Sequence, residues 1–266
     1  MPRLPAFALV LAVAVVAPPP AVGQDMLRHL DLASPRMTEA EMTREAVAAL
    51  LAAATPGKPA DFTGRRLSGL DLGGLDFSGA ILRAAVMNRT RLAGAVLAGA
   101  VLDQAWLLGA DLSRADLSGA SLFATQAMGA TFDGADLSAA RIAGDFTGAS
   151  LKGARLAGAS LGADMRNQSM GLMRAILKSA RLDGADLSGA DLSRTNLEFA
   201  VLADANLSGA DLRGAELGGA DLAGADVAGA DFAGADLAST KLRGVVGLGR
   251  ARNLEAARNL DRALRD

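Results

Sequence analysis

Residues 175–244 read AILKS ARLDG ADLSG ADLSR TNLEF AVLAD ANLSG ADLRG AELGG ADLAG ADVAG ADFAG ADLAS TKLRG, a five-residue unit repeated without interruption. The third position is a large apolar residue in all 14 copies, Leu in twelve of them and otherwise Val227 and Phe232. The first position is Ala in twelve copies and Thr in the other two, Thr195 and Thr240. A small residue and a large apolar residue, two positions apart, therefore define the repeat.

The same unit extends through most of the chain. Upstream, large apolar residues recur in the same phase from Phe62 to Ile142. One residue is then missing, and the apolar positions continue as Phe146 to Leu161 in a shifted phase. The original phase returns after an irregular break at about 162–171, which brings the total to 36 units.

A period of five excludes the ordinary regular elements. On an α-helix each step of five residues would rotate the apolar position by about 140°, so no continuous stripe would form. On a straight strand five is odd, so successive apolar residues would face opposite sides. A chain that turns a corner every five residues resolves the conflict, and four corners close a coil of 20 residues. With coils about 4.8 Å apart, nine coils predict a column roughly 40 to 45 Å long.

The unit Ala-Asp/Asn-Leu-x-x resembles the repeat of the pentapeptide-repeat family, and the resemblance covers about 62–242. It implies an all-β fold, a right-handed quadrilateral β-helix, with the two apolar positions of each unit inside. It implies little about function, because the repeat is a building unit of the fold and not a site.

Both ends of such a column need covers. Thr38 and Glu41 have the spacing of a capping box and predict an α-helix that begins at Thr38 and covers the N-terminal edge. Near the C-terminus, the apolar residues Leu254, Ala257, Leu260 and Leu264 have helical spacing and predict a second terminal α-helix, as a cap or a dimer contact. The expected regions are a signal peptide at 1–23, an N-terminal segment with the capping helix at 24–61, the β-helix at 62–242, and a helical cap at 243–266.

The first residues are typical of a secretory signal. Met1–Gly23 has Arg3 near its start, an uncharged apolar run at 6–17, and small residues before a cut predicted between Gly23 and Gln24. The run is shorter than the ~20 residues that span a bilayer. We therefore expect a periplasmic or secreted protein without stable membrane insertion after cleavage, and an uncleaved anchor is the alternative.

The composition leaves little material for catalysis. The chain has no Cys, and its one His, His29, lies close to the predicted cut. No GxxxxGK[ST] phosphate loop occurs, and the Asp spacing of five differs from the nonapeptide of calcium-binding β-rolls. The sequence therefore predicts a non-enzymatic protein without a cofactor or a metal.

Charge is unevenly distributed along the chain. The net charge is zero over 62–142, −6 over 177–242 and +3 over 243–266, and the whole chain carries −2. Resemblance to family members that confer quinolone resistance implies an alternative function, a cytoplasmic DNA mimic that regulates a type II topoisomerase. The predicted signal and the low total charge oppose it, so we expect a protein partner or self-association and no nucleic acid.

Large apolar residues also occur at positions that should face outward. If residues 20 apart share a side of the coil, these residues gather around one edge of the column. They are Ile81, Val86, Val101, Trp106, Leu108, Phe123 and Met128. Three covers are considered: this chain itself (the helix from Thr38 or the stretch near 165–173), a second copy in a homodimer, or an unknown protein partner.

The break in the period is a second candidate for recognition. It carries Arg166, Asn167 and Gln168. Irregular segments of solenoids map to one face, which is often a binding face. A tolerated insertion is the alternative.

Overall fold

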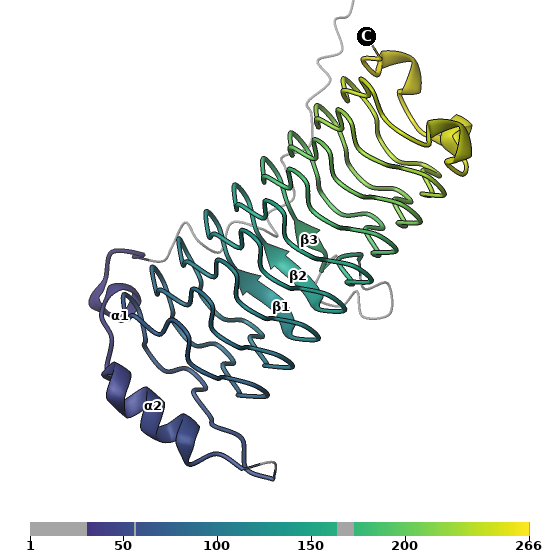
Figure 1. Ribbon diagram of the computed structural model, residues 1–266. Coiled ribbons are helices and arrows are strands. Elements are labelled where there is room, and N and C mark those ends of the chain that lie inside the picture. The colour runs from purple at the N-terminus through teal and green to yellow at the C-terminus, as the bar shows by residue number, and fades with distance from the viewer. Residues whose placement is uncertain (1–30, 56, 164–172, 266) are drawn as a thin grey trace, which may run out of the picture. The chain divides into compact units, whose positions relative to one another are not determined.

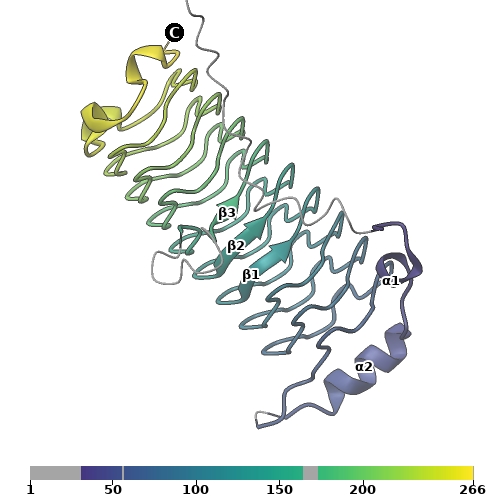
Figure 2. The same cartoon turned by 180° about the vertical axis from the view of Figure 1, so that it is seen from behind.

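The computed structural model describes residues 31–55, 57–163 and 173–265, and Leu32–Asp266 form one compact unit. Within this unit, stacked coils form a column with α2 at one end and the C-terminal residues at the other (Figure 1). Figure 2 shows the same coils from behind. No helix among the described residues has both the length and the apolar character needed to cross a bilayer. The elements are α1 (Pro35–Thr38), α2 (Arg44–Ala52), β1 (Ser121–Gln126), β2 (Arg141–Asp145), β3 (Ala175–Ile176) and the 3₁₀ turns η3 (Leu248–Arg250), η4 (Leu254–Ala256) and η5 (Leu260–Arg262).

The coils pair by parallel bridges at a regular spacing. Asp61 bridges Ile81, and Ile81 bridges Val101, so one coil takes 20 residues. The step shortens to 19 residues between Arg141 and Ser160, where the sequence loses one residue. It lengthens to 31 between Ser160 and Asp191, the coil that contains the break. The predicted four-sided coil is therefore confirmed, and the two irregularities of the period are absorbed within single coils.

The interior holds the two apolar positions of the repeat. Leu187, Leu207 and Leu222 are at most 1% exposed, and the Ala residues two positions before such centres are buried as well. Thr replaces Ala at a few of these small positions, and its hydroxyl donates to a main-chain carbonyl, as in Thr195 Oγ1 to Leu161 O at 3.1 Å. Large and small side chains alternate around each coil, which leaves room for one large side chain on each side of the tube.

Nearly all described corners have the same backbone. The residue two positions after a centre has a positive φ, for example 64° at Gly119 and 54° at Ala84, and the exceptions are Gly144 and Ala163 near the two irregularities. The turn closes with a hydrogen bond such as Ala85 N to Leu82 O at 3.1 Å. Gly is frequent there because it adopts positive φ without a steric penalty.

The polar position before each centre supports the same turn. Asp186 Oδ1, for instance, accepts from Ser188 N at 3.1 Å, and Asp221, Asp226 and Asp236 accept in the same way. A carboxylate that satisfies a turn N–H explains why Asp or Asn is common there.

A local irregularity joins β1 to β2. Their parallel register shifts between Phe123 and Thr125. At this shift Gly144 lies so close to Thr125 that a Cβ would overlap the Thr125 carbonyl oxygen. Gly144 is therefore required by close backbone approach, unlike the corner glycines.

The N-terminal helix differs from the predicted one. Thr43, rather than Thr38, caps α2 and accepts from Ala46 N at 3.3 Å. Thr38 ends α1 and donates to Ser34 O. The prediction was wrong because Glu41, its expected capping partner, instead forms ion pairs with Arg66 and a neighbouring Arg on the first coil. A tertiary contact overrides the local motif.

The predicted C-terminal α-helix is also wrong. The chain continues to coil in six-residue steps, and Arg252, Arg258 and Leu264 bridge residues of the preceding coil. Each of the steps at η4 and η5 begins with an Asn of positive φ, 54° at Asn253 and 56° at Asn259. Left-handed Asn residues interrupt an α-helix, whereas they suit a corner.

Candidate interaction surfaces

The structure brings the outward apolar residues together as predicted. Val101 stacks on Ile81 and Trp106 stacks on Val86, each pair joined by a parallel bridge. Leu108 and Met128 lie on adjacent coils of the side that carries Trp106. Phe123 belongs to the neighbouring side, where the Arg141 guanidinium lies 4.3 Å from its ring centroid. We call these seven residues the apolar edge.

The apolar edge is half-buried. Val86 is 5% exposed, and the other six residues have intermediate exposure. Stacking between coils accounts for part of this burial, because each side chain covers its neighbour on the next coil. The edge therefore offers continuous apolar area along three coils rather than isolated exposed side chains.

A segment of this chain binds beside the apolar edge. The Met37 carbonyl of α1 accepts from Ser68 Oγ at 2.9 Å and from Asn88 Nδ2 at 3.0 Å. Met37 is itself only 7% exposed, and Asn88 Oδ1 accepts in turn from Leu108 N. Of the three covers considered, an intrachain contact is thus present beside the edge, at Asn88, and it comes from α1 rather than from a helix that begins at Thr38.

The predicted recognition residues of the break, Arg166, Asn167 and Gln168, lie outside the described residues. The flanks of the break are held firmly. Ala163 N donates to Ser193 O on one side. On the other side Arg174 is 16% exposed and binds both carboxylate oxygens of Glu216, at 2.8 and 3.0 Å. This bidentate pair reaches across two coils and was not predicted, because Glu216 is 42 residues away in sequence.

Phe199 is an exposed aromatic residue that was not among the predicted interaction residues. It is 58% exposed and occupies a corner with φ of 57°. Lys178 Nζ lies 5.6 Å from the ring centroid. Its position two residues after Leu197 could have identified it, since the corner position always faces outward.

The carboxylates of the column are engaged in structural contacts. Asp191, Asp211 and Asp231 stack on successive coils, as predicted. The Arg213 guanidinium is the main cause of a lowered pKa at Asp211, and the Asn253 side chain has the same effect at Asp231. Among the described residues no group of three or more His, Cys, Asp or Glu is placed to hold a metal ion.

Comparisons with known proteins agree with this architecture. The family profile described as pentapeptide repeats matches eight copies, at residues 60–97, 92–134, 108–144, 180–219 and 215–246. A search of curated proteins gives no match.

Solved structures of pentapeptide-repeat proteins are similar to this chain. HetL, involved in heterocyst differentiation regulation in the cyanobacterium Nostoc sp. strain PCC 7120, is 31% identical over 84% of this chain and 94% of its own, with a TM-score of 0.45. QnrB1, a plasmid-mediated fluoroquinolone resistance protein, is 21% identical over 76% and 89%, with a TM-score of 0.43. The chain belongs to the pentapeptide-repeat family, and its column is the right-handed quadrilateral β-helix of that family.

Proposed function

We propose that this protein is a non-enzymatic interaction module that works outside the cytoplasm and binds a protein partner through the apolar edge. The observation that carries the proposal is the group of half-buried apolar side chains that stack on the outside of three consecutive coils and include Trp106. Aromatic residues in partly dry surroundings supply much of the energy of protein interfaces.

The packing of the column supports this proposal. Leu, Phe and Ala side chains fill the interior, so recognition has to use the outer faces. Those faces have a main chain fixed by bridges on every coil. A surface held this rigidly loses little conformational entropy when it binds.

Site-specific cross-linking tests the proposed surface. A photo-reactive residue at Leu108 or Met128, in the native cell, is expected to give a covalent adduct with a protein partner. Ser118 and Ser138 are matched control positions, one residue after a buried centre on another side of the coils. Equal labelling at the edge and at the controls would refute the proposal, and an adduct of two copies of this chain would identify a homodimer.

The location is tested independently. We expect N-terminal sequencing of the protein from fractionated cells to find a start at Gln24 in the extracytoplasmic fraction. A start at Met1 in the cytoplasmic fraction would refute this location and would return the topoisomerase-directed DNA mimic to consideration. A supercoiling assay with a purified type II topoisomerase would then decide that alternative.

A further inference from the structure

The two ends of the column are finished differently. At the N-terminal end Glu41 N donates to Arg66 O at 2.9 Å. The Arg44 guanidinium donates to Asp71 O and Gly73 O, at 2.6 and 2.9 Å. Residues before the first coil therefore occupy carbonyls that would otherwise form a free edge.

The last coil has no such cover among the described residues. In the preceding coil Phe232 N donates to Arg252 O, and Ala230 O accepts from Arg252 N, at 3.0 and 2.8 Å. The equivalent groups of the last coil form no hydrogen bond with another described residue. They are the N–H groups of Asn253 and Asn259 and the carbonyls of Ala251, Ala257 and Ala263. The end of the column thus presents an open template for an added strand.

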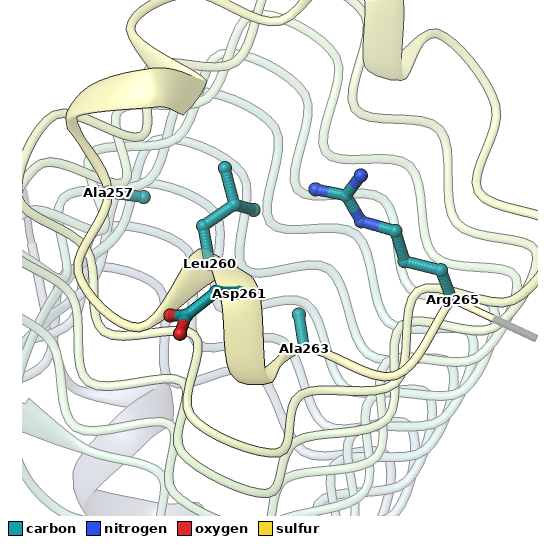
Figure 3. Close-up of a pocket in the computed structure, with 5 residues that line it drawn as sticks. All are labelled: Ala257, Leu260, Asp261, Ala263 and Arg265. Carbon is teal, nitrogen blue, oxygen red and sulfur yellow. The ribbon is translucent and has the colours of Figure 1, made fainter.

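The same end is apolar at its centre. Leu248, Leu254 and Leu260 pack against the core on one side and keep intermediate exposure on the other. A depression of about 590 Å³ lies beside Leu260, with Ala257 and Ala263 in its wall. Figure 3 shows the Leu260 side chain between Ala257 and the Arg265 guanidinium.

Basic residues outnumber acidic ones around this apolar centre, six to three over 243–266, although Asp261 also lines the depression. Arg250, Arg262 and Arg265 are exposed and form no ion pair with another described residue. Arg252 and Arg258 turn back instead and donate to carbonyls of the preceding coil. The net charge of +3 over 243–266 opposes the docking of a second identical end and favours a partner that carries carboxylates.

We infer that the C-terminal end of the column is a docking site for an extended, acidic segment of another protein. The segment pairs its main chain with the free groups of the last coil. Its apolar side chains cover Leu254 and Leu260, and its carboxylates face Arg250, Arg262 and Arg265. This site is separate from the apolar edge, and neither proposal depends on the other.

Selection of short random peptides displayed on phage, with the full chain as bait, tests the inference. We expect enriched peptides in which Asp or Glu alternates with apolar residues. Synthetic copies with Asp and Glu replaced by Asn and Gln should bind the unaltered protein roughly tenfold more weakly. This comparison changes only the peptide, so it does not depend on how a protein variant folds.

The protein side is tested by the triple variant R250E/R262E/R265E, which should also bind the peptides roughly tenfold more weakly. The matched control R89E/R114E/R194E reverses the same number of charges at exposed corners of the column and should bind as the unaltered protein does. Enriched peptides without acidic residues, or equal binding by both variants, would overturn the inference.

A second copy of this chain and a membrane surface are the alternative occupants of this end, and each predicts a different experimental result. Sedimentation velocity that shows a dimer, lost in the triple variant, would assign the end to a second copy and overturn the inference. Binding of vesicles of phosphatidylserine and phosphatidylcholine that is lost in the triple variant, together with failure to enrich acidic peptides, would assign it to a membrane surface and would also overturn it.

Discussion

The two ends of the column show two ways to finish a solenoid. At the N-terminal end Val47 of α2 is fully buried in the core, and Arg44 occupies main-chain carbonyls of the first coil. At the C-terminal end the final residues extend the coil and leave Leu254 and Leu260 half-exposed. A repeat protein needs a cap where its repeats stop, because each repeat is stabilised only by its neighbours. The difference shows that residues before the first coil close the N-terminal end, whereas no described residue closes the last coil, which is the end that we propose binds a partner.

A carboxylate introduced at each end of the column should show the largest difference in stability between the two ends. Val47→Asp places a carboxylate in the apolar core and should lower the free energy of unfolding by about 3–5 kcal/mol. Leu254→Asp should cost only about 1–2 kcal/mol, because its side chain reaches solvent. Urea unfolding measures both variants. Equal losses would show that the last coil is as closed as the first and would remove the basis of the comparison.

A substitution at Gly144, where β1 and β2 change register, should lower the free energy of unfolding by less than Val47→Asp does but by more than Leu254→Asp does. Gly144→Ala forces a Cβ into the Thr125 carbonyl and should cost about 2–3 kcal/mol. Gly129→Ala is the control, since a Cβ there meets open space and only the positive φ of 64° is penalised, by about 1 kcal/mol. The measurement is the midpoint of urea unfolding. Similar losses for the two would show that the register shift tolerates a side chain.

The hydrogen bonds that attach the two terminal segments should contribute less. Asn253 and Asn259 donate to Asp231 and Asp236, at 2.9 and 2.8 Å. Replacement of each Asn by Gly keeps the positive φ accessible and should cost about 1 kcal/mol per bond. Arg44→Leu at the other end should cost about 1–3 kcal/mol, because its donor is charged.

Hydrogen exchange locates these losses along the chain. The Asn variants should increase exchange only near the last coil, and Arg44→Leu only near the first. Exchange that rises throughout the column in either case would contradict nearest-neighbour stabilisation.

Low pH should lower the stability of the protein by the smallest amount among these changes, and it should act at both ends of the column. The Asn259 side chain is the main cause of a lowered pKa at Asp236, and the Arg66 side chain is the main cause at Glu41. Because these pKa values are lower in the folded state, the stabilisation is complete above the unfolded pKa, near 4. It is lost as the pH falls through the folded value. Thermal unfolding at pH 3 and pH 7 should show a smaller difference for Asn259→Gly and for Glu41→Gln than for the unaltered protein.

Much of the fold could be predicted because the interior obeys one rule. Burial of Leu187 and the positive φ at Gly119 both follow from an interval of five residues and a corner in each interval. The apolar edge could be predicted for the same reason, since residues one coil apart lie side by side. Local motifs were less reliable. Thr38 and Glu41 have capping-box spacing, yet Glu41 pairs with Arg66 of the first coil.

The periodic sequence is sufficient to determine which side chains face inward, where the corners lie and how many residues one coil contains, because a small and a large apolar side chain fill each side of the tube at a fixed interval. Only the folded chain decides that Met37 binds Asn88 beside the apolar edge, that Arg174 reaches Glu216, and which main-chain groups of the last coil lack a hydrogen-bond partner within the described part of the chain. These contacts join residues from different coils or from outside the repeats. They depend on distances across the stack, which no local pattern specifies.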